Sequence, residues 1–173
     1  MVAQLTNAFA RPPVLMRNAL NGLPVVDFGC QYSRQFLDWN VPLNNIVSVI
    51  WVVGSQNGGN FLLSGASTTD FHRGGSASLN PDWLKLEAGI FSVANMVTWV
   101  DGRLCDSQTT PLSGGFQIIS TRFTGSYKGI ATRIGQDRNF FERSGALRLA
   151  ELLIYSRALT EKERIDTEAA LRA

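Results

Sequence analysis

The acidic residues and the single histidine show whether this chain could carry out hydrolysis. Cleavage of a glycosidic bond needs two carboxylates that face one cleft at a suitable separation. The acids on apparent strands, Asp101, Asp106 and Glu151, are isolated from one another. Nucleophilic catalysis by a serine would have to use His72, and no G-x-S-x-G motif occurs. We therefore expect a protein that is not an enzyme.

Glu151 is the acid whose surroundings are easiest to predict. It lies in the apolar run 146–155, and strand alternation places it on one face with Leu149, Leu153 and Tyr155. A half-buried carboxylate there needs a partner, and an arginine is the obvious one. We expect Glu151 to be tied to an arginine or a tyrosine inside the fold; a catalytic acid with a raised pKa is the alternative.

The aromatic residues favour sugar binding over catalysis. A flat ring stacks on the C–H side of a pyranose, and fixed polar groups beside it bind the hydroxyls. Trp51 is predicted to lie in the core, whereas Trp39 and Trp99 fit either the core or a sheet surface. Trp83 and Tyr127 fall in predicted turns, where an ordinary loop role is the alternative. The tentative ligand-binding residues are His72, Arg73, Trp83, Trp99 and Tyr127.

The two cysteines, Cys30 and Cys105, match no zinc site, because no C-x-x-C motif occurs and the chain holds one histidine. We expect two small buried thiols. A disulfide between an early and a middle strand is the alternative. A titration of free thiols after unfolding is expected to find two.

The composition indicates one globular domain over residues 1–173. The chain is 45% hydrophobic and 17% charged and holds 16 glycines, a balance typical of a turn-rich β protein. A net charge of +2 without a basic block gives no basis for nucleic-acid binding. The longest apolar run, 46–53, is too short to cross a bilayer. The first fifteen residues lack the pattern of a signal peptide, so we expect any export signal to lie outside this sequence.

Short strands separated by turns make up most of the predicted secondary structure. Arg11-Pro12-Pro13 predicts an extended edge segment over residues 2–17. The run 46–53 is apolar on both faces and belongs in the interior, with 60–64 as its hairpin partner. Asn21-Gly22 predicts a turn before a short strand at 25–28, and Asp101-Gly102 predicts the turn of a hairpin over 95–105. Further strands are expected at 35–39, 83–86, 89–93, 116–120, 130–134 and 146–155. A loop is expected at 121–129, and the stretch 67–80 is expected to be mostly loop or a weak edge strand.

A short helix is predicted to follow the last strand. Thr160 and Glu163 form a T-x-x-E capping box, in which each side chain binds a free backbone N–H at the helix start. Ile165 and Ala169 are expected to give the helix a modest buried stripe.

Three parts of the chain resemble the concanavalin-A-like and laminin-G-like domains of secreted bacterial proteins. They are the N-G-x-P-V-V-x-F phrase at 21–28, the hairpin around Asp101-Gly102, and the order of turn, long strand, arginine and capped helix over 134–173. The resemblance covers residues 11–173 and implies an all-β, two-sheet antiparallel jelly-roll β-sandwich with a short C-terminal helix. It also implies that a first strand is missing, which would leave an exposed sheet edge for an assembly partner.

The resemblance carries expectations about metal and catalysis as well. Related domains often hold calcium at the loop rim through Asp or Asn oxygens. Asp70, Asp82, Asp101 and Asp137 could supply such oxygens, and no other cofactor is expected. Relatives that cleave glycans carry E-x-D-x-x-E or E-x-D-x-E on one strand, a spacing that this chain lacks.

The sequence therefore favours a non-catalytic, lectin-like recognition module that binds carbohydrate in a secreted or cell-surface protein. The alternative is a structural or adhesive module that binds another protein through a sheet edge or face. A glycoside hydrolase or lyase is the third hypothesis. The positions of Trp83, Trp99 and Tyr127 separate the first two, because aromatics on a concave face favour glycan and buried aromatics favour the structural role.

Overall fold

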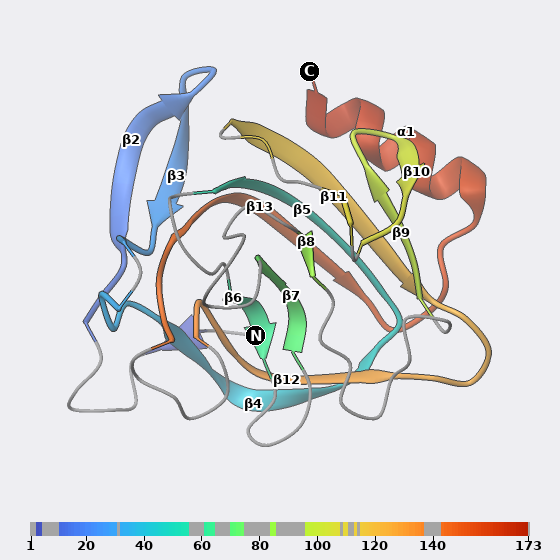
Figure 1. The fold of residues 1–173 in the computed structure, drawn as a ribbon, viewed down its shortest axis with the longest axis horizontal. Coiled ribbons are helices and arrows are strands. Elements are labelled where there is room, and N and C mark those ends of the chain that lie inside the picture. Colours follow the sequence, from blue (N-terminus) through green and yellow to red (C-terminus); the bar gives the residue numbers. More distant parts are fainter. Residues whose placement is uncertain are drawn as a thin grey trace.

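The computed structural model describes residues 3–4, 11–30, 32–55, 61–64, 70–74, 84–85, 96–107, 109–110, 113, 115–136 and 143–172. Two antiparallel sheets face each other, and a helix near the C-terminus lies beside one of them (Figure 1). The all-β, two-sheet prediction with a short C-terminal helix is confirmed at this level.

The first sheet has six described strands. Their order is β1 (Ala3–Gln4), β4 (Leu37–Ile46), β12 (Gly129–Ile134), β6 (Phe61–Ser64), β7 (Asp70–Gly74) and β8 (Leu84–Lys85). The second sheet has seven, in the order β10 (Arg103–Cys105), β9 (Met96–Val100), β11 (Phe116–Phe123), β5 (Ser48–Ser55), β13 (Leu147–Tyr155), β3 (Leu23–Asp27) and β2 (Val14–Leu20). The helix α1 spans Glu161–Arg172.

Strand β5 forms the centre of the second sheet and is buried on both faces, as its apolar run predicts. Val49, Trp51 and Val53 belong to the main core between the sheets. Ile50 and Val52 belong to a smaller cluster on the outer face, which Leu159 also joins. Trp51 is thus a core residue, and the last strand, β13, lies inside the sheet between β5 and β3.

The expected hairpin between 46–53 and 60–64 is wrong. Strand β6 lies in the six-stranded sheet beside β12 and β7, while β5 pairs with β11 and β13. Because both edges of β5 are taken by long strands, the chain crosses to the other sheet after it. Strand β11 also runs to Phe123, since Thr121 and Phe123 pair with Thr98 and Met96. The expected strand at 89–93 lies outside the described residues.

A β-bulge in β13 overturns the expectation for Glu151. Leu149 pairs with Val53 and Glu151 pairs with Val52, so Ala150 is the extra residue. A bulge shifts the alternation of the side chains that follow it. As a result Leu152 and Ile154 pack against the main core, Leu153 and Tyr155 pack on the outer face, and Glu151 is exposed.

The two predicted turns are confirmed by their backbone conformation. Asn21 and Gly22 have φ angles of 49° and 81°, and Asp101 and Gly102 have 51° and 85°. Consecutive positive φ values are the mark of a type I′ hairpin turn, which glycine permits in its second position. The first turn joins β2 and β3, and the second joins β9 and β10.

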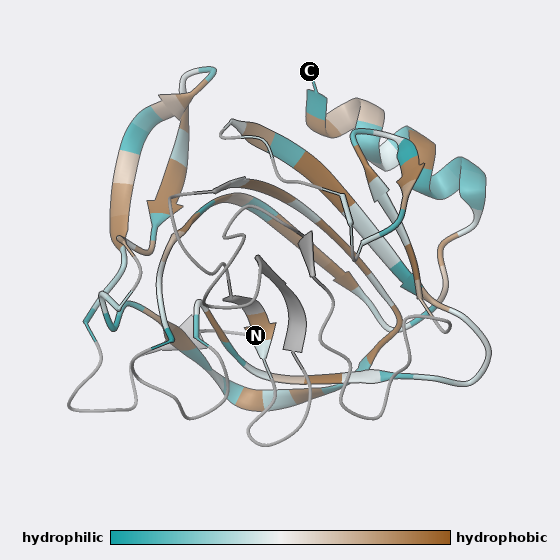
Figure 2. Ribbon diagram, in the orientation of Figure 1, coloured by the Kyte–Doolittle hydropathy of each residue, from teal (hydrophilic) through white to brown (hydrophobic). Residues whose placement is uncertain are grey.

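The capping box at the start of α1 is confirmed. The backbone N–H of Glu163 donates to Thr160 Oγ1 at 3.2 Å, and the backbone N–H of Thr160 donates to Glu163 Oε2 at 2.8 Å. The expected apolar stripe is wrong, because Ile165 and Ala169 are exposed and the buried helix residues are Arg164 and Glu168. Figure 2 shows the start of α1 in hydrophilic colours. The helix is therefore held on the sheet largely by charged groups.

Candidate functional site

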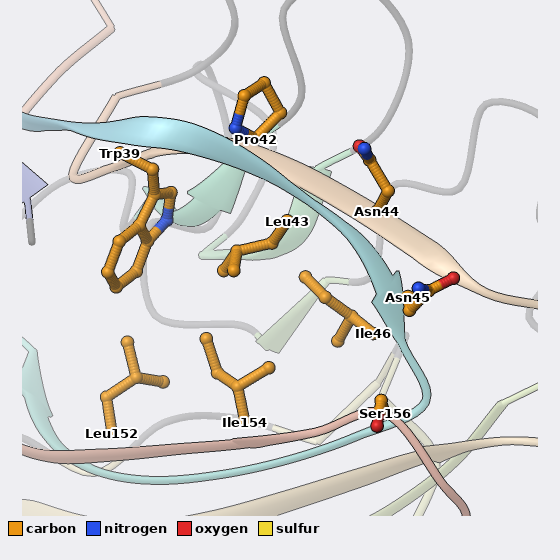
Figure 3. Close-up of a pocket in the computed structure, with 9 residues that line it drawn as sticks. All are labelled: Trp39, Pro42, Leu43, Asn44, Asn45, Ile46, Leu152, Ile154 and Ser156. Atoms are coloured by element: carbon orange, nitrogen blue, oxygen red, sulfur yellow. The ribbon is translucent and has the colours of Figure 1, made fainter. Parts of the chain in front are cut away.

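A groove opens between the two sheets, where β4 lies across from the end of β13. It encloses about 570 Å³ and is shown in Figure 3. Its lining is formed by Trp39, Pro42, Leu43, Asn44, Asn45, Ile46, Leu152, Ile154 and Ser156. We call it the inter-sheet groove.

An irregularity in β4 positions the tryptophan of this groove. Leu43 pairs with Ala131 and Asp38 pairs with Arg133, so only Thr132 lies between these pairs on β12, whereas residues 39–42 lie between them on β4. The surplus residues bend β4 away from its neighbour. Pro42 lies in this stretch and has no N–H to donate to a ladder, which fits a bulge.

The apolar part of the inter-sheet groove is an incompletely covered piece of the main core. Trp39, Leu43, Leu152 and Ile154 all pack against that core, yet each is only partly buried. Ile46, behind them, is 1% exposed. Apolar surface left open at the mouth of a core is available to a ligand.

The indole nitrogen of Trp39 is a buried donor without a hydrogen-bond partner among the described residues. Figure 3 shows this nitrogen on the side of the ring that lies toward Leu43. Leaving such a donor unpaired costs about 1–3 kcal/mol. An acceptor atom of a ligand in the groove would remove that cost.

The opposite end of the inter-sheet groove is polar and uncharged. Asn45 and Ser156 lie there, away from Trp39, and both are exposed (Figure 3). Two charged side chains that adjoin lining residues in the chain are already paired: Asp38 Oδ1 lies 3.1 Å from Arg133 Nε, and Arg157 is paired with Glu163. Among the described residues, no charged side chain lines the groove.

The structure separates the residues that the sequence selected as a ligand site. Trp99 is 7% exposed and lies beneath the helix, so it is not a rim residue. Tyr127 is exposed on the segment between β11 and β12 and does not line the inter-sheet groove. His72 and Arg73 lie in β7, a strand between β6 and β8, and not in a loop. Trp83 lies outside the described residues.

Trp99 forms the centre of the contact between the helix and the sheet. The guanidinium carbon of Arg164 lies 4.5 Å from the centroid of its ring, and that of Arg122 lies at 5.4 Å. Arg164 Nη1 donates to Glu168 Oε1 at 2.6 Å, and Ser120 Oγ donates to the same oxygen at 2.7 Å. A buried glutamate–arginine tie therefore exists, but it is in α1 and not at Glu151.

The acids considered for calcium are only partly described. Asp101 accepts hydrogen bonds from the backbone N–H of Ile118 at 2.9 Å and from Gln117 Nε2 at 3.5 Å, so it secures the β9–β10 turn. Asp70 lies in β7, and Asp82 and Asp137 lie outside the described residues. Within the described ranges, no group of three His, Cys, Asp or Glu side chains could hold a metal ion.

Both cysteines are free thiols in the structure. Cys30 is exposed, which contradicts the expectation that it is buried. Cys105 is partly buried, and this burial raises the pKa of its thiol. Deprotonation of Cys105 is therefore disfavoured, and Cys30 is the more accessible of the two.

Sequence reasoning missed most of the inter-sheet groove because it ended a strand at Trp39. Strand β4 continues to Ile46 in spite of Pro42. The signal that could have revealed the site is the order of the stretch: a tryptophan, then a proline within an otherwise strand-like run, then two adjacent asparagines, Asn44 and Asn45. A proline inside such a run marks a bulge or an edge.

Comparisons with known protein families, curated proteins and solved structures find no match to this chain. In the part of the chain that the structure describes, no helix has the length and apolar character needed to span a membrane.

Proposed function

We propose that this chain is a non-catalytic recognition module that binds carbohydrate in the inter-sheet groove. The observation that carries the proposal is Trp39, a partly exposed indole whose N–H has no partner among the described residues, in a groove whose other end bears an uncharged amide and a hydroxyl. A ring face for C–H groups and neutral hydrogen-bonding groups for hydroxyls are the two requirements of sugar binding.

The fold supports the same proposal. Two antiparallel sheets with the last strand inside one of them fit a jelly-roll β-sandwich of the laminin-G-like or concanavalin-A-like kind. The N-G and D-G hairpins and the capped helix, on which the resemblance depends, are present in the structure and support this part of the proposal. We extend the proposal to an exported or surface-attached parent protein on this resemblance.

Binding without cleavage also agrees with the chemistry of the lining. Glycoside hydrolysis uses a pair of carboxylates on either side of the scissile bond. The described lining of the inter-sheet groove offers amides and a hydroxyl in place of carboxylates. A bound sugar would thus be held by neutral donors and acceptors.

A glycan array run with and without calcium tests the proposal. We expect binding to at least one neutral glycan, loss of that binding in Trp39→Ala, and retention in Tyr127→Ala, which truncates an exposed aromatic outside the groove. Thermal melting in calcium and in chelator would show whether a metal contributes. Absence of any bound glycan, or equal losses in both variants, would overturn the proposal.

A specific observation favours a second candidate, binding of another protein through the edge of the seven-stranded sheet. Strand β2 is the last described strand of that sheet, and Val14 and Leu15 are 56% and 55% exposed. Leu23 on β3 is 64% exposed, and Figure 2 shows hydrophobic colours along this hairpin. An exposed apolar edge strand can pair with another chain.

The mass of the protein in solution tests this second candidate. It predicts a stable oligomer or hetero-complex at micromolar concentration that dissociates in Leu15→Lys, because an edge lysine opposes strand pairing. The variant Tyr127→Lys, at an exposed position outside this edge, should leave the assembly intact. A monomer at all concentrations, with no captured strand-like partner, would remove the candidate.

A further inference from the structure

We infer that the ligand of the inter-sheet groove is a neutral glycoside that carries an apolar aglycone, such as an alkyl chain. The inference rests on the proposed function and concerns the same site. It assigns the sugar to the polar end and the apolar group to the interior part of the groove.

The first support is the excess of apolar lining. Six of the nine lining residues are apolar, namely Trp39, Pro42, Leu43, Ile46, Leu152 and Ile154. Hydroxyl groups placed against leucine and isoleucine side chains lose their bonds to water and gain none in return. An alkyl group in the same place gains by leaving water. A bare sugar would therefore fill this part of the groove poorly.

The second support is the arrangement of the polar groups. Asn45 and Ser156 lie at one end, whereas the unpaired N–H of Trp39 lies at the other, among apolar side chains (Figure 3). An ether oxygen within the apolar group would satisfy that single donor, whereas the glycosidic oxygen stays beside the sugar at the polar end. Several hydroxyls there would not all find partners. The polar end can bind the remaining hydroxyls through amide and hydroxyl groups.

The third support is the lack of charge in the described lining. An anionic head, such as a carboxylate or a phosphate, would need a cation, and Arg157, which follows the lining residue Ser156 in the chain, is already bound to Glu163 by two hydrogen bonds of 2.7 and 2.8 Å. Desolvating an anion without a partner is strongly unfavourable. The head group is therefore neutral, as in a simple hexoside.

Calorimetric titration with a matched series of probes tests the inference. The series comprises methyl, butyl and hexyl β-glycosides of glucose, galactose, mannose and N-acetylglucosamine, with hexanol as the apolar control. We expect affinity to rise with chain length for at least one sugar, by up to about fourfold for each methylene group that is buried. We also expect hexanol to bind far more weakly than the corresponding hexyl glycoside.

Two adjacent leucines of β13 provide matched variants. Leu152 lies in the inter-sheet groove, whereas Leu153 packs on the outer face of the same sheet. Leu152→Ala should remove most of the chain-length dependence, and Leu153→Ala should retain it. If Leu152→Ala does not fold, Asn45→Asp at the exposed polar end replaces a donor with a charge and should weaken hexyl-glycoside binding about fivefold.

Each contrary result has a distinct meaning. Equal affinity for methyl and hexyl glycosides would overturn the inference and leave carbohydrate binding in place. Equal affinity for hexanol and the hexyl glycoside would overturn the role of the sugar. Equal losses in Leu152→Ala and Leu153→Ala would remove the groove as the site. Failure of every probe, together with an empty glycan array, would end the proposed function as well.

Discussion

Trp39 and Trp99 lie on strands of opposite sheets and have opposite surroundings. Trp99, on β9, is 7% exposed and lies next to the guanidinium groups of Arg122 and Arg164. The polar atoms around it are joined in hydrogen bonds with Glu168 and with the backbone. Trp39, on β4, is partly exposed, and its own N–H has no hydrogen-bond partner in the part of the chain that the structure describes. Trp99 is therefore enclosed by contacts within the fold, whereas Trp39 keeps a donor that a ligand could bind.

Residue type alone therefore does not separate a tryptophan that is enclosed by the fold from one that keeps a donor without a partner among the described residues. What separates them is whether the neighbouring polar groups are satisfied within the chain. Around Trp99 they are, because α1 brings Arg164 and Glu168 onto the sheet. At Trp39 the indole N–H itself has no hydrogen-bond partner among the described residues, at a place where the register of β4 against β12 is irregular.

The ion pair over Trp99 should be the most costly feature to break. Arg164→Met keeps the bulk of the side chain and leaves Glu168 buried without its closest cation, which lies 2.6 Å away. We expect the free energy of unfolding in urea to fall by about 3 kcal/mol. Adding Glu168→Gln to this variant should recover part of the loss.

Arg164→Met should not change ligand binding in the inter-sheet groove. Measured at a temperature where the variant is fully folded, the affinity for glycoside or glycan is expected to stay within about twofold of the parent chain. The free-energy effects of substitutions at distant sites are usually independent of one another. A loss of stability below about 1 kcal/mol in Arg164→Met would show that the charged contact is not what holds α1.

Phenylalanine substitutions should give the next largest difference in stability between the two tryptophan positions. Trp99→Phe shrinks a buried ring and weakens its contact with two cations, so we expect about 2 kcal/mol of destabilisation. Trp39→Phe removes an unpaired donor, so stability should change by less than about 1 kcal/mol while ligand affinity falls. Urea unfolding and calorimetric titration on both variants give the two readouts. Equal destabilisation by both would contradict the distinction.

The sequence was sufficient for features that depend on local chemistry. The turns at Asn21-Gly22 and Asp101-Gly102 and the cap at Thr160 were predictable because their conformations are decided by neighbouring residues. The buried run of β5 was predictable from its apolar residues, and so was the edge position of residues 14–17, whereas residues 3–4 of the same expected segment lie in the other sheet.

Features that depend on distant partners could not be predicted. The bulge at Ala150 reverses the faces of β13 and exposes Glu151, yet nothing in the local sequence marks it. The role of Trp99 depends on Arg164, which lies far along the chain and reaches the ring only after α1 docks. Strand β6 crosses to the other sheet because β5 is already paired on both edges. Turns were therefore predictable from the sequence, whereas most of the residues that line the inter-sheet groove were not.

The smallest effect is expected at the start of α1, in the pH dependence of stability. Hydrogen bonds from Arg157, together with those from Thr160, lower the pKa of Glu163 from 4.5 to about 2. A carboxylate whose pKa is lower in the folded state stabilises the fold above its unfolded pKa, and this contribution disappears as the pH falls through the folded pKa. The contribution is therefore present above about pH 4.5 and is lost between about pH 4.5 and 2.

Glu163→Gln isolates this contribution. The melting temperature of the parent chain should exceed that of the variant by a constant amount above pH 5, and the gap should narrow as the pH is lowered toward 2. Because Glu163 is partly exposed, added salt should reduce the gap as well. Helical circular dichroism should follow the same trend, since the cap belongs to the helix that covers Trp99. A gap that stays constant from pH 5 to 2 would show that Glu163 does not hold the helix start through its charge, and the cover over Trp99 would then depend on Arg164 and Glu168 alone.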